Sequence, residues 1–180
     1  MKMQIKKYTF LMVALVLVTL NISILYAVGG NMTKIQSTTD VYYSLVQDVH
    51  YPKNLAKGKK LPVVFLIHNG LEDKASWGDF PQEIARQGFF TVNLTWKNWG
   101  PAEVETAIKY TLDNYKDMID TNRVILIGGC HGGKDALQII AKKDLGYKVK
   151  TAVVLSVSED DQVVLDSQKE DHCPILAYYA

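Results

Sequence analysis

Residues 128–133, which read Gly-Gly-Cys-His-Gly-Gly, have the types and the spacing needed for covalent chemistry. Glycines stand two residues before and two residues after Cys130, which is the small-x-nucleophile-x-small pattern of a reactive side chain on a tight strand-to-helix turn. Glycine is needed because a larger side chain would collide with the neighbouring strand and helix. The backbone N–H of His131 would face the oxygen of an attacked carbonyl group, and the N-terminus of the following helix would stabilise a thiolate. The pattern predicts a Cys130 nucleophile on a turn shaped by Gly128, Gly132 and Gly133.

Two kinds of nucleotide-binding turn also carry glycines at set spacings. A dinucleotide site needs G-x-G-x-x-G after the first strand and an acid about 20 residues later, but no register of these glycines has that spacing and the turn comes late in the chain. A phosphate loop needs G-x-x-x-x-G-K followed by Ser or Thr. Gly128, Gly133 and Lys134 satisfy the first part, but Asp135 stands where the hydroxyl should be and would repel phosphate. Both alternatives are disfavoured.

The segments around this turn alternate between strand-like and helix-like patterns. Continuous or alternating apolar runs predict strands at residues 41–49, 61–67, 89–94, 123–127, 152–157 and 174–179. Apolar residues at helical spacing predict helices at residues 77–87, 101–115 and 134–142, whereas residues 161–168 are ambiguous. Strands that alternate with helices are joined by right-handed crossovers. We therefore predict an α/β fold with a mainly parallel sheet and helices on both of its faces.

The chain from residue 61 to its end resembles the α/β-hydrolase superfamily, and its Gly-x-Cys-x-Gly-Gly turn resembles that of the dienelactone hydrolase group. Besides the turn, the resemblance rests on His68-Asn69-Gly70 after a buried strand and on Gln87-Gly88-Phe89 before the next one. It implies hydrolysis of an ester or related acyl bond of a small molecule by Cys130. It also implies a second oxyanion donor, a backbone N–H near Gly70, a loop-organising role for His68, and no metal or organic cofactor.

An acid and a histidine are expected after the nucleophile, in that chain order. The family places the acid after the strand predicted at 174–179 and the histidine after one further strand, and this chain ends at Ala180. We therefore expect a truncated sheet that lacks the last strand and helix of the family. Asp160, which follows the strand predicted at 152–157, is the candidate acid within the chain.

The histidines within the chain are poorly placed to replace such a base. His172 precedes a strand and so belongs to the opposite edge of the sheet, the side chain of His131 is expected to point away from the thiol, and His50 is expected to be exposed in the early hairpin. Trp96 and Trp99 follow the carboxyl end of a strand, and they would line a pocket there or pack in the core. Two functions stay open: a hydrolase, which this short form could leave inactive, and a non-catalytic exported domain that keeps the fold and the pocket.

The N-terminus has the pattern of a targeting segment. Basic residues precede an uncharged, mostly apolar stretch at residues 8–27, and small residues follow it. Residues 1–29 are therefore predicted to be a signal peptide or an uncleaved N-terminal membrane anchor, residues 30–40 a linker, and residues 41–180 the truncated domain. Either form of the segment would export the domain, which would be secreted or held in the cell envelope.

The charge balance gives no reason to expect a nucleic-acid partner. Outside residues 1–29, 17 basic and 19 acidic residues remain, whereas phosphate binding needs a clustered basic face. The pattern says nothing about the oligomeric state.

Two cysteines in an exported chain invite a disulfide. Cys130, however, follows a strand, and Cys173 precedes one, so the two belong to opposite edges of the sheet. A five-residue strand spans roughly 16 Å, and bridged Cα atoms lie within about 7 Å of each other. We therefore expect no bond between these two thiols.

Overall fold

The computed structural model describes residues 34–42, 45–95, 100–142, 145–156 and 173–178, all of them within the compact unit Thr33–Ala180. Several predictions fall outside these residues: the targeting segment at 1–29, the segment 161–168, and the side chains of Trp96, Trp99, Asp160 and His172. Among the helices that the structure describes, none is long and apolar enough to cross a membrane.

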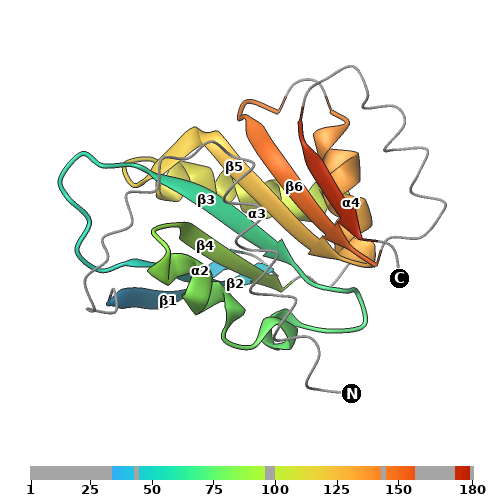
Figure 1. Cartoon of the computed structure of the whole chain (residues 1–180), viewed down its shortest axis with the longest axis horizontal. Helices are drawn as coiled ribbons and strands as arrows, with labels where there is room; N and C mark the ends of the chain where they lie inside the picture. Colours follow the sequence, from blue (N-terminus) through green and yellow to red (C-terminus); the bar gives the residue numbers. More distant parts are fainter. Residues whose placement is uncertain (1–33, 43–44, 96–99, 143–144, 157–172, 179–180) are drawn as a thin grey trace. The chain divides into compact units, whose positions relative to one another are not determined.

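The described residues form a seven-stranded sheet with the order β1-β2-β4-β3-β5-β6-β7 (Figure 1). The pairs β1–β2 and β2–β4 are antiparallel, and the pairs from β4 onward are parallel. The mainly parallel sheet is therefore confirmed. The strands are β1 (Ile35–Tyr42), β2 (Leu45–Pro52), β3 (Leu61–Ile67), β4 (Phe90–Thr95), β5 (Ile119–Gly129), β6 (Val149–Leu155) and β7 (Ile175–Tyr178).

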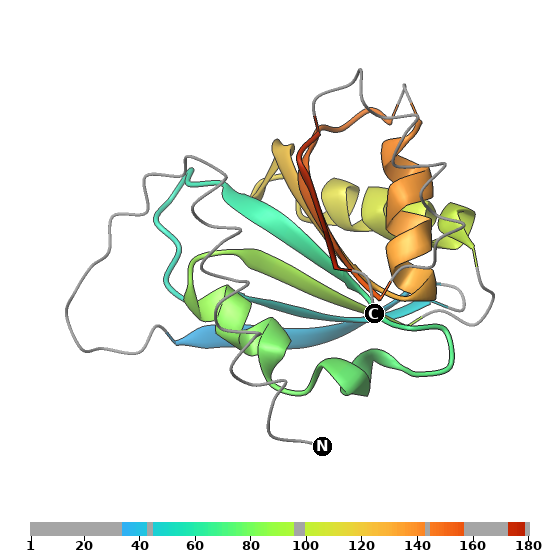
Figure 2. The same ribbon diagram turned by 45° about the vertical axis from the view of Figure 1, so that its right-hand side comes forward.

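Helices cover both faces of this sheet, as predicted (Figure 2). They are η1 (Lys74–Trp77, a 3-10 turn), α2 (Phe80–Arg86), α3 (Pro101–Asn114) and α4 (His131–Ile140). α2 packs against β2 and β4, whereas α4 packs against β5, β6 and α3. The largest apolar core lies between α3, α4 and the sheet, and its buried members include Phe65, Phe90, Ile108, Leu126 and Leu137.

The N-terminal hairpin differs from the prediction. β1 begins at Ile35, within the residues predicted to be a linker (30–40), and the single strand predicted at 41–49 is divided between β1 and β2. The side chains of residues 35–41 of β1 are exposed or half-buried, so no apolar pattern marks this part of the strand. It forms because it pairs with β2 along its length and gains contacts such as the hydrogen bond from Thr39 Oγ1 to Asp48 Oδ1 (2.7 Å).

Two helices begin elsewhere than predicted, in both cases because of glycine. The helix predicted at 77–87 is divided into η1 and α2 by Gly78, whose φ of 55° is left-handed and interrupts the helix. The helix predicted at 134–142 is α4, which already begins at His131. The two glycines after His131 are helical although glycine is a weak helix former. The prediction therefore placed the first residue of the helix after these glycines.

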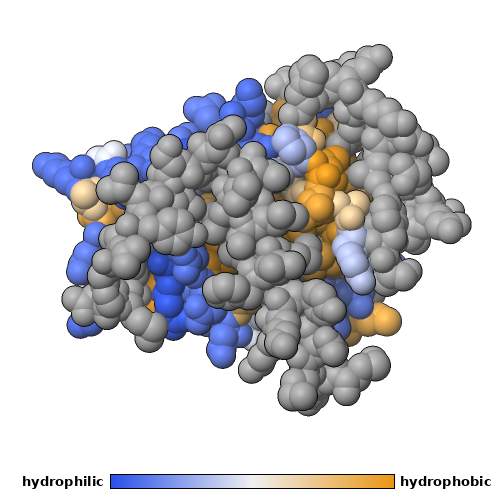
Figure 3. All heavy atoms as spheres, viewed as in Figure 1, coloured by the Kyte–Doolittle hydropathy of each residue, from blue (hydrophilic) through white to orange (hydrophobic). Residues whose placement is uncertain are grey.

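β7 forms the edge of the described sheet beside β6. Its residues are half-buried apart from Tyr178, which is exposed, and hydrophobic side chains gather over β6 and β7 on the face shown in Figure 3. Because β5, β6 and β7 run parallel, Cys130 after β5 and Cys173 before β7 lie at opposite edges. Both thiols are free.

Candidate functional site

Cys130 sits on a strained turn between β5 and α4. Its backbone has φ 48° and ψ −113°, and it is the N-cap residue of α4. A positive φ costs a residue with a Cβ roughly 1–2 kcal/mol, so the surrounding structure must hold this conformation. One such contact is the hydrogen bond from the Cys130 N–H to the carbonyl of Leu155 at the end of β6 (2.7 Å).

Two glycines allow α4 to approach the sheet at this turn. A Cβ on Gly128 would lie 2.3 Å from the carbonyl oxygen of Gly132, and a Cβ on Gly132 would lie 2.3 Å from the carbonyl oxygen of Ile67. Both distances are far below van der Waals contact, and the opposing atoms are backbone. Glycine is therefore required at both positions, for the steric reason that the sequence pattern predicts. Gly129 is not restricted in this way, because the nearest atom to its Cβ would be the Asn69 nitrogen at 3.9 Å.

The loop after β3 lies beside the elbow, which is the turn at residues 128–133. β3 and β5 are neighbours with parallel direction, so both segments leave the same edge of the sheet (Figure 1). His68 in this loop is 2% exposed, and its Nδ1 is 2.6 Å from the carbonyl oxygen of Asn69. The half-buried Gly70 follows. The structure thus brings the loop of Gly70 and the turn of Cys130 to one place.

The imidazole of His131 contacts the thiol. Cys130 Sγ lies 3.5 Å from His131 Nδ1, so the prediction that this side chain points away from the thiol is wrong. Cys130 is the N-cap and His131 the first residue of α4, and the two side chains leave the same end of the helix. His131 is exposed and Cys130 is half-buried, so both can be reached from solvent.

A buried carboxylate lies one helical turn beyond His131. Asp135 is 7% exposed, and burial raises its pKa from 3.8 to about 6, although the positive charges of His131 and Lys134 act in the opposite direction. In the sequence, Asp135 stood out only as a mismatch to a phosphate loop. Its burial had a sequence signal, because Asp135 and the fully buried Ile139 are four residues apart and share one face of α4.

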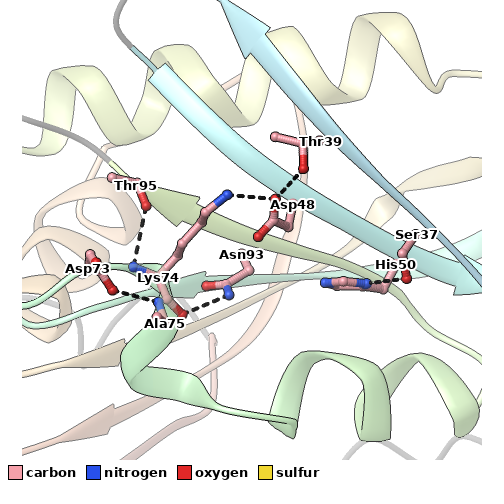
Figure 4. Close-up of polar contacts among 9 residues, drawn as sticks. All are labelled: Ser37, Thr39, Asp48, His50, Asp73, Lys74, Ala75, Asn93 and Thr95. Carbon is pink, nitrogen blue, oxygen red and sulfur yellow. Dashed lines mark hydrogen bonds and ion pairs between the residues drawn. The ribbon is translucent and has the colours of Figure 1, made fainter.

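The segment between β3 and α2 is tied to the sheet at Lys74 (Figure 4). Lys74 Nζ forms an ion pair with Asp48 Oδ1 on β2 (2.6 Å). The main chain of Lys74 is held by β4, because its N–H donates to Thr95 Oγ1 (3.3 Å) and its carbonyl accepts from Asn93 Nδ2 (2.9 Å). These contacts fix the segment that carries Gly70. They could not be predicted from the sequence, because the four residues come from three separate elements.

The Lys74–Asp48 pair allows a first prediction. Burial raises the pKa of Asp48, but hydrogen bonds from Lys74 and Thr39 outweigh burial and leave the pKa below its usual value. A carboxyl with a lowered pKa stabilises the fold at neutral pH, and that contribution is lost as the pH falls through the folded-state pKa. We expect Lys74→Met to lower the free energy of unfolding by about 1 kcal/mol at pH 7, and by less at pH 3, in urea titrations.

The control for this change is Lys57→Met, which removes an exposed lysine from the loop between β2 and β3. It should alter the free energy of unfolding by less than about 0.5 kcal/mol at either pH. A loss for Lys74→Met at pH 7 that is no larger than the loss for Lys57→Met would show that the ion pair contributes nothing.

His50 is buried, contrary to the prediction that it is exposed. It lies on β2 at 5% exposure, and its Nδ1 is 2.8 Å from Ser37 Oγ on β1 (Figure 4). Burial lowers the pKa of His50, against the negative charge of Asp48. Its neighbours Val49 and Tyr51 belong to the apolar core, so His50 faces the other side of the sheet, and α2 packs against β2. Ser37 lies on β1, in residues predicted to be a linker. His50 lies on β2, two strands away from β3 in the sheet order, and is not part of the elbow.

The described residues hold no group of three or more His, Cys, Asp or Glu side chains that could bind a metal ion. Asp160, the candidate acid, and His172 belong to the parts of the chain that the structure does not describe. Around the turn at residues 128–133, the structure describes Cys130, His131, Asp135 and the loop of Gly70.

Comparison with known proteins identifies the fold. The chain matches no protein-family profile. It is 29% identical over 163 residues to dipeptidyl-peptidase 5 of Aspergillus oryzae, a match that includes 77% of this chain and 20% of that protein. The chain thus spans about a fifth of the length of the curated relatives that it matches.

Solved structures are similar over more of their length. A bacterial heroin esterase superposes with a TM-score of 0.56 at 20% identity, over 86% of this chain and 52% of that one. Esterase B from Lactobacillus rhamnosis (HN001) superposes with a TM-score of 0.57 at 14% identity, over 92% of this chain and 64% of that one. Together with the strand order and the parallel sheet, these similarities show that the chain has the α/β-hydrolase fold.

Proposed function

We propose that this chain hydrolyses an ester or a related acyl bond of a small molecule, with Cys130 as the nucleophile. The observation that supports this best is the strained backbone of Cys130, held between two glycines that admit no side chain. A connection between a strand and a helix needs neither feature. Strain that the surrounding structure maintains is typical of catalytic turns.

The chemistry follows from the placement of the turn. The thiol gives up its proton as the sulfur attacks the carbonyl carbon, and the C=O electron pair moves to oxygen. The oxyanion is held by the backbone N–H groups of His131 and of a residue near Gly70. When the intermediate collapses, the C–O bond of the leaving group breaks, the leaving oxygen takes up the proton to give the alcohol, and an acyl thioester remains on Cys130. Water then hydrolyses the thioester, which releases the acid and restores the thiol.

The comparisons support the hydrolysis of acyl bonds in general. The identity of the nucleophile and the type of turn are proposed here. The similar proteins carry the names of esterases and of a dipeptidyl-peptidase, and both classes break acyl bonds. The alternative of a non-catalytic binding domain finds no support among them. A thiol in place of the serine of the G-x-S-x-G pattern, the dienelactone hydrolase type of turn, and Asp160 as the acid are the further parts of the proposal.

The test is hydrolysis of p-nitrophenyl acetate and p-nitrophenyl butyrate by the purified chain. Release of p-nitrophenol above the uncatalysed rate is expected for the unchanged chain, and Cys130→Ala is expected to reduce it to that background. The matched control is Cys173→Ala, which removes the other thiol at the opposite edge of the sheet and should leave the rate unchanged. Turnover that survives Cys130→Ala would contradict the proposal.

A further inference from the structure

The elbow contains an imidazole as well as a thiol. The 3.5 Å between Cys130 Sγ and His131 Nδ1 is a distance at which the S–H can donate to the ring nitrogen. The two side chains adjoin in the sequence and leave the same end of α4. No movement of a distant segment is needed to bring them together.

We propose that His131 is the base of this site: it takes the proton of the Cys130 thiol through Nδ1, and the carboxylate of Asp135 stabilises the imidazolium that results. The inference deepens the proposed function and, as far as turnover is concerned, rests on it. Its central step, activation of the thiol, can be measured without any ester.

The charges around the elbow favour this proton transfer. The N-terminus of α4 stabilises the negative sulfur, and Asp135 one turn further along stabilises a positive ring. His131 and Asp135 are four residues apart on α4, a spacing at which opposite charges on a helix attract. Burial raises the pKa of Asp135 to about 6, so the carboxyl is mostly ionised at pH 7 and above.

Few other titratable groups of the described residues face this end of α4. On α4 itself, the positive charge of Lys134 disfavours a positive charge on the nearby imidazole of His131. The neighbouring loop after β3 contains the buried His68. Glu105 on α3 is engaged with Lys109 and with Lys142, which follows the other end of α4. β6 ends beside the turn at Leu155, and neither Leu155 nor the following Ser156 carries a charge.

The step balances within the site. As the S–C bond forms, the thiol proton moves from Sγ to Nδ1 and the C=O electron pair moves to oxygen. When the C–O bond of the leaving group breaks, the imidazolium returns that proton to the alcohol. In the second half His131 takes a proton from the attacking water and gives it to the departing sulfur. His131 touches the reacting atom and acts as a catalytic residue, whereas Asp135 acts through His131 as a positioning residue.

The test measures the rate at which iodoacetamide alkylates Cys130 at pH 6.5 and at pH 9.5. All variants also carry Cys173→Ala, so that Cys130 is the one thiol that can react. With a base beside it the thiol reacts at pH 6.5, and His131→Gln should lower that rate about tenfold because glutamine cannot accept the proton. At pH 9.5 thiols ionise without help, so the two rates should agree. Asp135→Asn should lower the rate at pH 6.5 by about threefold, and the control His172→Gln should not change it.

Each result decides the inference. A rate in His131→Gln that equals the unchanged chain at pH 6.5 overturns it. An equal fall of the alkylation rate at both pH values also overturns the inference, because loss of a base would slow the reaction only at pH 6.5. Circular dichroism checks that each variant is folded. If alkylation depends on His131 but no ester is hydrolysed, the proposed function alone fails. If Cys130 hydrolyses esters equally well in His131→Gln, this inference alone fails.

Discussion

Alanine in place of Gly132 is expected to lower the free energy of unfolding by about 3 kcal/mol or more, a large part of the roughly 5–15 kcal/mol that stabilises a typical domain. The added Cβ would lie 2.3 Å from the carbonyl oxygen of Ile67 and 2.5 Å from that of His68. Both atoms belong to the backbone at the end of β3, which is held between β4 and β5. Neither can move without breaking the parallel pairing, so α4 would have to leave the sheet.

Urea unfolding followed by circular dichroism measures this loss, and Gly129→Ala is the matched control. Position 129 precedes Cys130 directly, and the nearest atom to its Cβ would be 3.9 Å away, an ordinary contact. This change should therefore alter the free energy of unfolding by less than about 1 kcal/mol. Equal stability of the two variants would mean that α4 does not approach β3 as closely as described.

Replacing Asp135 by asparagine is expected to remove a large pH dependence of stability. Burial raises the pKa of Asp135 in the folded chain from 3.8 to about 6, so the folded state binds the proton more tightly than the unfolded state. The contribution to stability is then full below about pH 4, falls as the pH rises, and is lost above about pH 6. A shift of about two units corresponds to roughly 2–3 kcal/mol.

The measurement is the difference in unfolding free energy between Asp135→Asn and the unchanged chain, taken at intervals from pH 4 to pH 7.5. Asparagine has nearly the same size and does not titrate, so the difference should move in favour of the variant by about 2–3 kcal/mol over this range. The subtraction cancels the contribution of the carboxyls with lowered pKa, which makes stability rise with pH. These carboxyls are Asp48, Glu105 and Asp120. The control is Asp113→Asn, an exposed carboxyl on α3, for which the difference should be flat. A flat difference for Asp135→Asn as well would show that this carboxyl is not buried in the folded chain.

The expected cost of Asp135 at neutral pH fits its proposed role. A carboxylate that destabilises the fold, on a helix face that otherwise packs apolar residues, is typical of a site in which function opposes stability. Asparagine would be the more stable choice and could not hold a negative charge beside His131.

The sequence alone determined the parts of this protein that depend on local pattern. The seven apolar residues of β3 were predicted with their true bounds, because a strand buried on both faces needs an uninterrupted run. The glycines at positions 128 and 132 indicated a close approach of strand, turn and helix, because only a residue without a Cβ permits it. Alternating strands and helices then led to the parallel sheet and to the edge at which Cys130 lies.

Which side chains meet depends on how the elements pack, and local pattern does not predict it. β1 lacks an apolar pattern and forms because β2 is there to pair with it, and that pairing places Ser37 beside the buried His50. Lys74 and Asp48 lie far apart in the chain, and their contact depends on the register of β2 against β4. The thiol and imidazole of the elbow adjoin in sequence, yet their contact depends on the left-handed backbone at Cys130. The hydrophobic pattern of the sequence determines which residues of a strand or helix are buried. The distances between reactive side chains depend on how these elements pack.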